Sequence, residues 1–368
     1  MGQPSHRFKV IPFGAMDILW YSLLLILLLW HSRPCRVNPD CLDRETTNAI
    51  KGFFIGTVFF RHFVSYMDKP GVWHPVDSWF AQLIVVMFLF YSGYGMMVQF
   101  ENRGNAYIRT IPAKRILPTL VNFDIAVLLF GILGLLMGRA YTLKQFALSL
   151  VAWETVGNSN WYIFVILLCY TATLFCFSVF LRRRNVMSWQ RLLLLGLVFL
   201  VYVFFVRRLK PHNWHDTIFA FWGGVAYGLF RVRFEHVLDR YWSICLVVGV
   251  IGTFALPLLP SAGRWLWAVL NARALCFALS ILVASRRFHI ESKPLSWCGR
   301  NLFPLYIYQR IPMLLCKHFH PAAFAGGCDE KWLPFFFFVS LAVTLGIAWI
   351  FPVFRYPWNP TRGGHHSP

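Results

Sequence analysis

The stretch K-G-F-F-I-G-T-V-F-F-R-H, from Lys51 to His62, places a cation at one end of an apolar run and an imidazole at the other. On an α-helix, which rises about 1.5 Å per residue, these two groups lie about 16 Å apart. The spacing predicts a membrane helix with Lys51 near one face of the bilayer and His62 towards its middle. Ionisable side chains at that depth are costly and usually serve a function. Arg61 beside His62 adds a second such group; the structural alternative is a buried polar pair satisfied by neighbouring helices.

The composition of the chain excludes a soluble domain. Of 368 residues, 58% are apolar and only 14% are charged, a balance typical of a polytopic membrane protein. The formal charge of +20 comes from short clusters of Lys and Arg between apolar runs. Such clusters orient a membrane protein and meet lipid headgroups. We therefore expect membrane lipids as partners and no nucleic acid.

The cysteine and histidine patterns do not predict a disulfide framework or a metal site. The nine cysteines lie mostly inside apolar runs, which argues against disulfides. Cys35 and Cys41 flank a polar loop, and His212-x-x-His215 and His318-x-His320 have ligand-like spacing. None of these groups is accompanied by the further Cys, His or Glu that a metal site needs. We predict no metal.

The apolar runs predict an all-α bundle of about eleven transmembrane helices. The first run is kept as a helix because no small-residue cleavage site follows it. We expect residues 1–45 to form this helix and a polar loop, 46–354 a ten-helix core, and 355–368 a cytoplasmic tail, in which Gly363-Gly364-His365-His366 is disordered. Besides the Lys51 helix, the predicted spans are 11–31, 79–99, 116–138, 160–181, 191–207, 214–230, 242–259, 266–285, 298–317 and 333–354.

The loops differ in charge. One side of this topology holds about twice as many Lys and Arg as the other. The richer side consists of loops 32–51, 101–115, 182–191, 231–240 and 286–300 and the C-terminus. The positive-inside rule makes the richer side cytoplasmic. This places Lys51 at a cytoplasmic mouth and the N-terminus outside.

Two further segments hold small or basic residues in a distinctive order. The first, F-Y-S-G-Y-G at 90–95, contains small residues that allow close helix packing. The second, A-K-R-I-L-P at 113–118, begins a helix with Lys114 and Arg115 on the cytoplasmic side. With Lys51 they would form a basic mouth for a phosphate-bearing donor. Ordinary anchoring at the membrane face explains the same cations equally well.

Together these segments resemble the acyltransferase-3 family of integral-membrane O-acyltransferases. Lys51 and His62 match its Arg-x10-His element, and segments 90–95 and 113–118 resemble its F-x-S-G and R-I-L-P elements. N-S-N-W-Y-I-F at 158–164 and N-W-H-D-T-I-F-A-F-W-G-G at 213–224 are similar to later family segments. L-S-W-C-G-R-N-L-F-P-L-Y-I-Y-Q-R-I-P-M at 295–313 resembles the terminal signature. The resemblance covers residues 46 to 354.

The chain departs from the family pattern at two positions. Lys51 stands where the family has arginine, which keeps the charge but loses the planar guanidinium. Gln309 stands where many members have histidine, so a second catalytic imidazole is absent. Gln309 can hydrogen-bond a substrate oxygen but cannot move protons at neutral pH.

The resemblance implies transfer of an acyl group, commonly acetyl, from cytoplasmic acyl-CoA to a hydroxyl of a cell-envelope carbohydrate or lipid-linked glycan. Acyl-CoA is then a co-substrate, and no bound cofactor is expected. His62 is the expected general base, and Arg61 is a candidate for stabilising the oxyanion. Candidates for holding the phosphates of the donor are Lys51, Lys114 and Arg115. Candidate substrate contacts are Trp161, Tyr306, Gln309 and Arg310.

Two other functions remain open from the residues alone. A transporter or flippase of a lipid-linked sugar would use the same polar residues as a pathway, although the sequence has no internal repeat of the transporter kind. A catalytically silent relative would explain Gln309, although it leaves the retention of His62 unexplained. The expected location is a cell (plasma or inner) membrane, crossed several times, with the C-terminus in the cytoplasm.

Overall fold

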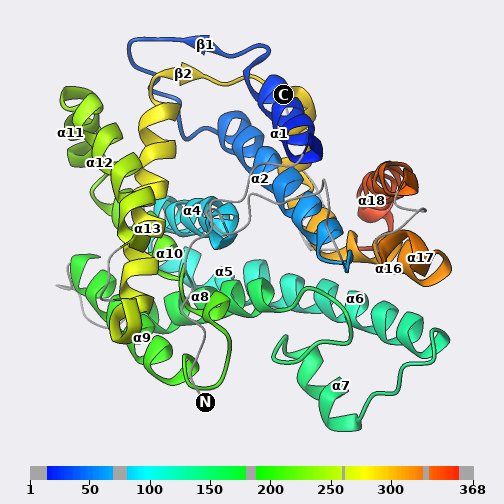
Figure 1. Ribbon diagram of the computed structural model, residues 1–368. Helices are drawn as coiled ribbons and strands as arrows, with labels where there is room; N and C mark the ends of the chain where they lie inside the picture. Colours follow the sequence, from blue (N-terminus) through cyan, green and yellow to red (C-terminus); the bar gives the residue numbers. More distant parts are fainter. Residues whose placement is uncertain (1–14, 69–80, 180–187, 259–261, 326–330, 356–368) are drawn as a thin grey trace, which may run out of the picture. The chain divides into compact units, whose positions relative to one another are not determined.

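The computed structural model describes residues 15–68, 81–179, 188–258, 262–325 and 331–355, and these residues are almost wholly helical (Figure 1). The disordered-tail prediction and the start of the first predicted helix fall outside the described residues. The main helices are α1 Ala15–Leu29, α2 Arg44–Val64, α4 Val86–Arg103, α5 Asn105–Ile111, α6 Leu117–Leu136, α7 Leu143–Leu150, α8 Trp161–Ser178, α9 Ser188–Val206, α10 Phe219–Leu229, α11 Arg231–Arg240, α12 Trp242–Ala255, α13 Ala262–Ser285, α14 Lys293–Arg300, α15 Leu302–Tyr308, α16 Arg310–Phe319, α17 Pro321–Phe324 and α18 Leu333–Phe354.

Single-turn elements complete the chain. Short 3-10 helices cover Ala81–Val85 (η1), His212–Trp214 (η3) and Leu256–Leu258 (η4), and a π-helical turn covers Pro112–Ile116 (η2). The strands β1 Arg33–Pro34 and β2 Phe288–His289 form an antiparallel pair in which Arg33 faces His289. This pair ties the loop after α1 to the segment that follows α13.

Within the described residues, six helices are long and apolar enough to cross a membrane, or seven if the bent pair α11–α12 forms one span. The all-α membrane fold is therefore confirmed, but the count of eleven spans is not. The bent pair turns through 98° between Arg240 and Trp242, so the predicted span 242–259 has a helix lying across its start. The predicted span 214–230 is a helix of only 11 residues, α10.

The predicted span 298–317 is not one helix. The chain breaks at Asn301 and again at Gln309, giving α14, α15 and α16. Pro304 and Pro312 explain both breaks. A proline inside a helix lacks the N–H that would bond to the carbonyl four residues earlier, so it fits best in a first turn. Each proline accordingly lies in the first turn of the helix that follows a break.

A different proline effect shapes the run from α5 to α6. Pro112 lies inside a continuous stretch from Asn105 to Leu136, which stays helical over 32 residues through the π-helical turn η2. Widening the helix by one residue at η2 accommodates the missing N–H of Pro112. Figure 1 shows α5 and α6 in line along this run. Lys114 and Arg115 lie within the widened turn.

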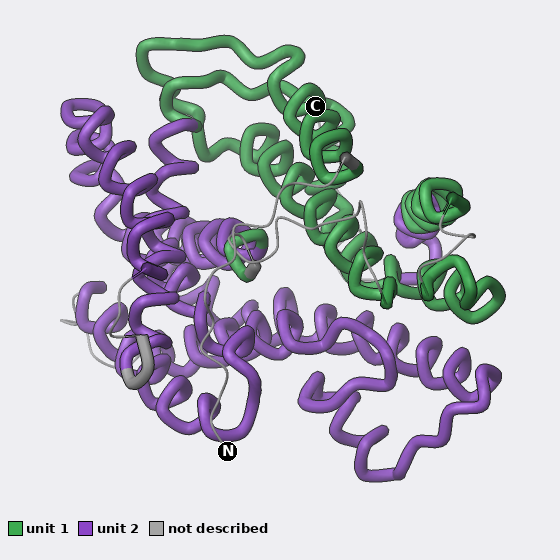
Figure 2. Tube along the Cα trace, in the orientation of Figure 1, with its two compact units in different colours: residues 1–84, 285–345 green, residues 85–284, 346–368 purple. Residues whose placement is uncertain are grey.

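The chain divides into two compact units, each made from separated stretches of sequence (Figure 2). Unit 1 contains residues 1–84 and 285–345, and unit 2 contains residues 85–284 and 346–368. The predicted boundaries at residues 45 and 354 stay predictions.

Unit 1 is built on close packing of α2 against α14 at two glycines. A Cβ atom at Gly52 would overlap the carbonyl of Leu295, and one at Gly299 would overlap the carbonyl of Asn48. Only glycine lets the two backbones approach this closely. The aromatic side chains of Phe60, Phe63 and Phe337 are fully buried nearby, with Phe63 and Phe337 packed edge to face at 5.2 Å.

Unit 2 uses the same packing between α4 and α10. A Cβ atom at Gly93 would overlap the carbonyl of Phe221, and one at Gly224 would overlap the carbonyl of Phe90. These glycines come from F-Y-S-G-Y-G and from the segment 213–224. Gly93 and Gly224 therefore serve helix packing, whereas a Cβ atom added at Gly95 would have no atom within 4 Å.

Candidate active site

The helix α2 carries both residues of the Lys51–His62 element. It begins at Arg44 because the side chain of Asp43 caps it, accepting a hydrogen bond from the backbone N–H of Thr46 at 2.6 Å. Lys51 therefore lies about two turns inside the helix. His62 lies in the last turn, before the helix ends at Val64. One continuous helix between the two groups is confirmed, while their depth in a bilayer stays a prediction.

Three side chains surround His62. The ring of Tyr306 lies 6.1 Å from the His62 ring, measured between centroids, at an angle of 52°. The guanidinium groups of Arg310 and Arg61 both act electrostatically on the imidazole. Among the described residues, no group hydrogen-bonds the buried Nδ1 of His62. The structure thus brings His62, Arg61, Tyr306 and Arg310 together within unit 1.

The break between α15 and α16 lies between Tyr306 and Arg310 in the chain. Gln309 lies at this break, is fully buried, and donates a hydrogen bond from Nε2 to the carbonyl of Tyr306 at 2.9 Å. Its Oε1 is buried with no hydrogen-bond partner in the described part of the chain. Arg310 follows, stacked over the Tyr66 ring at 5.7 Å, with a buried Nε that likewise lacks a partner among the described residues.

This cluster has the groups that acyl transfer requires. An imidazole with an unengaged ring nitrogen can take a proton from a hydroxyl. A guanidinium with an unengaged N–H can donate to a carbonyl oxygen that becomes negative. The buried amide oxygen of Gln309 can accept a hydrogen bond from a substrate hydroxyl.

The first turn of α2 is fixed to α14 by a polar contact that the sequence did not reveal. Ser296 donates a hydrogen bond to Glu45 Oε2 at 2.5 Å, and Arg300 donates to Glu45 Oε1 at 3.0 Å. The hydrogen bond from Ser296 lowers the pKa of the Glu45 carboxyl, and Arg300 lowers it further. This contact and the glycine packing hold α2 in register with α14, on the chain segment that leads into Tyr306.

Two of the three residues predicted to hold the phosphates of the acyl donor, Lys114 and Arg115, lie in unit 2. Lys114 is exposed on the turn η2. Arg115, its neighbour, interacts with the hydroxyls of Tyr107 and Tyr170. Tyr170 was missed because it lies on α8, far from Arg115 in sequence, and Tyr107, eight residues before Arg115 on α5, is not marked by any motif. Lys51 lies in unit 1, half-buried on α2 beside Gly52.

Trp161, the predicted sugar contact, begins α8 and is half-buried, with its ring 6.0 Å from that of Tyr162. The loop before it is held by Asn160, whose Nδ2 donates to the carbonyls of Ala152 and Glu154. Trp161 therefore stands at the edge of an ordered loop in unit 2.

A second histidine group lies between α9 and α10. His212 Nδ1 lies 3.0 Å from Asp216 Oδ2, and Asp216 is 3% exposed. His215 is also buried, and its pKa falls to about 4 because of burial and the nearby charges of His212 and Arg207. In the described ranges, no three His, Cys, Asp or Glu side chains gather as a possible ion site, and the absence of a metal stays a prediction.

The apolar helices indicate a multi-pass membrane protein, and the polar cluster at His62 is its candidate active site. Comparison with known families identifies it further. The family model named acyltransferase 3, described as an acyltransferase domain, matches residues 46–352, so the chain belongs to the acyltransferase-3 family and is an acyltransferase. No curated protein and no solved structure matches the chain.

Proposed function

We propose that this protein transfers an acyl group, commonly acetyl, from acyl-CoA to a hydroxyl of a cell-envelope carbohydrate or lipid-linked glycan. The family match over residues 46–352 carries the acyltransferase part of this proposal. The cluster around His62 supports chemistry at a hydroxyl, because it combines a base, hydrogen-bond acceptors and guanidinium groups. A membrane with the C-terminus in the cytoplasm is the proposed location.

The reaction uses His62 as the general base. The imidazole takes the proton from the acceptor hydroxyl while the hydroxyl oxygen attacks the thioester carbon of the donor. A C–O bond forms and the C–S bond breaks. The proton held by His62 then passes to the departing thiolate, which leaves as free CoA. The ring is neutral again after each turnover.

Arginine and glutamine side chains assist this step. Arg310, with its buried unengaged Nε, joins Arg61 as a donor to the oxyanion that forms on the thioester carbonyl. Gln309 and Tyr306 contact the acceptor. In unit 2, Lys114 and Arg115 are proposed contacts for the donor phosphates, and in unit 1 Lys51 is proposed for the same chemical role. Trp161 is a further candidate contact for a sugar face.

The test is CoA release by the purified full-length protein, with a cell-envelope extract as the acceptor. Native protein is compared with His62→Ala and with His318→Ala, which changes an exposed histidine of the same unit. We expect release that needs both the extract and His62, with donor binding retained in all three proteins. A folded native protein that neither binds nor consumes acyl-CoA would overturn the proposal and favour transport of a lipid-linked sugar.

A further inference from the structure

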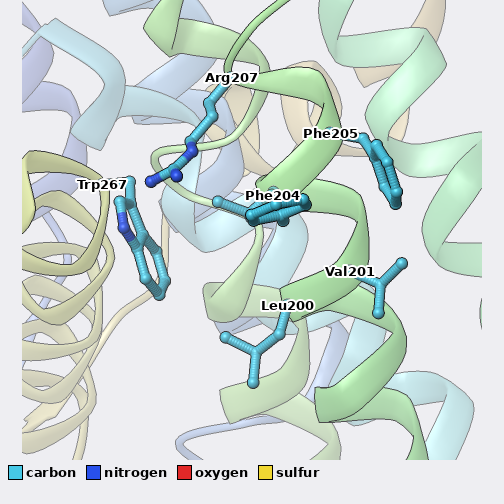
Figure 3. Close-up of a pocket in the computed structure, with 7 residues that line it drawn as sticks. Leu200, Val201, Phe204, Phe205, Arg207 and Trp267 are labelled. Carbon is cyan, nitrogen blue, oxygen red and sulfur yellow. The ribbon is translucent and has the colours of Figure 1, made fainter. Parts of the chain in front are cut away.

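A groove of about 330 Å³ runs along the last two turns of α9. It is lined by the aliphatic and aromatic side chains of Leu200, Val201, Val203, Phe204 and Phe205 and by Trp267 of α13. Figure 3 shows Trp267 across from Leu200 and Phe204. At its end, Arg207 lines the groove. All of these residues belong to unit 2.

The groove lies on a surface that would face lipid. Helix α9 is one of the helices able to cross a membrane, and the side chains at Leu200, Val201, Phe204 and Phe205 are between 44 and 59% exposed. An apolar concavity within a bilayer is filled by a hydrocarbon chain, because water does not occupy it. A volume near the lower end of about 300–1,000 Å³ for ligand sites has room for one chain rather than two.

The mouth of the groove is basic. Helix α9 ends at Val206, and Arg207 and Arg208 follow, stacked over the Phe204 ring at 5.5 and 4.6 Å. Figure 3 shows Arg207 reaching from the end of α9 toward the side of the groove where Trp267 lies. In the part of the chain that the structure describes, neither arginine has a carboxylate within ion-pair distance.

Lys210, which follows Arg207 and Arg208 in the chain, differs from them because other protein groups bind it. Its Nζ lies 3.1 Å from Glu154 Oε1, donates to the carbonyl of Trp153 at 2.7 Å, and lies over the Trp153 and Trp214 rings. This cation is therefore occupied by protein groups. Arg207, which lines the groove, keeps its guanidinium charge for an outside anion, and a guanidinium suits phosphate because it can donate two parallel hydrogen bonds.

Polar side chains come a few residues after Arg207, at the basic end of the groove. Arg207 is close enough to act electrostatically on His215, and His212, whose side chain is 61% exposed, is held by the buried carboxylate of Asp216. Such groups can hydrogen-bond hydroxyls. The order along this surface is thus an apolar groove, then a guanidinium, then hydroxyl-binding groups. It matches the order of parts in a lipid phosphate that carries a sugar.

We infer that this groove binds a single-chain lipid phosphate, with the chain along α9, the phosphate at Arg207 and the head group beside His212. All of these groups belong to unit 2, so the site does not depend on the chemistry proposed at His62. The groove is then a specific lipid site rather than a place for bulk lipid.

The test uses hexadecyl phosphate with a photoreactive diazirine on its chain, added to the full-length protein in nanodiscs of neutral phosphatidylcholine. We expect the label on peptides of α9 and α13, and competition by unlabelled hexadecyl phosphate but not by hexadecanol. Arg207→Gln should raise the half-labelling lipid fraction about tenfold, because one charge-assisted contact is lost. Arg208→Gln, the matched control, should raise it by about threefold or less.

A second pair of variants tests the groove itself. Val201→Trp fills it, and we expect the label on α9 to be lost. Leu197→Trp places the same ring one turn earlier, at a residue that is 56% exposed and does not line the groove, and should leave labelling unchanged. Both positions are on the outer surface of α9, so neither substitution disturbs the packed interior.

Two results would overturn the inference. One is an equal effect of Arg207→Gln and Arg208→Gln, which would indicate a diffuse surface charge. The other is displacement of the label by two-chain phosphatidylglycerol as effectively as by hexadecyl phosphate, which would indicate an ordinary lipid position. Neither result depends on acyl transfer. Protein that is labelled in the groove but never releases CoA would retain this site and refute the proposed reaction instead.

Discussion

His62 in unit 1 and His212 in unit 2 have opposite surroundings. His212 is paired through Nδ1 with the buried carboxylate of Asp216 at 3.0 Å. His62 has two guanidinium groups nearby, and its buried Nδ1 has no hydrogen-bond partner among the described residues. A carboxylate orients an imidazole and fixes which nitrogen carries the proton. The protein thus supplies a partner for His212 Nδ1, whereas among the described residues it supplies none for His62 Nδ1.

The two units nevertheless use the same packing. Gly52 and Gly299 allow α2 and α14 to meet, and Gly93 and Gly224 do the same for α4 and α10. Close backbone packing therefore does not distinguish the units. Their chemistry differs through the charged side chains that the packed helices carry.

The largest effect is expected at His62. We expect His62→Gln to lower CoA release by about 10²–10⁴-fold, since the amide cannot accept the proton of the acceptor. His318→Gln changes an exposed histidine of the same unit and should stay within about twofold of native. The measurement is the rate of thiol release under saturating donor. A His62→Gln enzyme with native turnover would remove the base from the mechanism.

The next largest effect is expected where α2, the helix that carries His62, packs against α14 at Gly52. Gly52→Ala should lower the free energy of unfolding by about 3 kcal/mol, because the new methyl group meets the backbone of Leu295, which cannot move aside like a side chain. Gly95→Ala is the matched control on α4, where no atom lies within 4 Å of the added Cβ. Thermal unfolding in detergent compares them. Equal stability of the two variants would contradict the close approach of α2 and α14.

The environment of His215 predicts a pH dependence of stability. Its pKa is about 4 in the folded protein, lowered by burial, by His212 and by Arg207, and about 6.5 when unfolded. Below pH 6.5 the unfolded chain binds the proton more readily, so stability falls as the pH drops. Between pH 7 and 5 this amounts to about 2 kcal/mol.

The measurement for His215 is the thermal midpoint at several pH values. His215→Gln should flatten the dependence over this pH range, whatever its effect at pH 7. His236→Gln, at an exposed position on α11, should retain the native slope. If His215→Gln keeps that slope as well, another group is responsible.

The smallest effect is expected at Lys51. Lys51→Arg restores the arginine of the family pattern, with the same charge and a planar group that can bind phosphate through two hydrogen bonds. We expect the KM for acyl-CoA to fall by about threefold or less, with kcat unchanged. Lys51→Gln should raise it. A change in kcat without a change in KM would move Lys51 from donor binding to another role.

The helical class was predictable because a helix in lipid satisfies its own backbone and needs only a local apolar run. α18 coincides with the predicted span 333–354, and α8 and α13 differ from theirs by only a few residues. The predicted span 298–317 failed for a local reason as well. Its apolar composition concealed Pro304 and Pro312, which end helices although they are compatible with a hydrophobic segment.

The sequence by itself determined that this chain is a helical membrane protein, and that Lys51 and His62 share one helix, because hydropathy and helix spacing depend on neighbouring residues alone. Only the tertiary structure decided the partners of each polar group: Tyr306 and Arg310 beside His62, Asp216 on His212, and Tyr107 and Tyr170 on Arg115. Tyr306, Arg310 and Tyr170 are distant in sequence from the groups they meet. Packing therefore chooses them, and no local pattern records the choice.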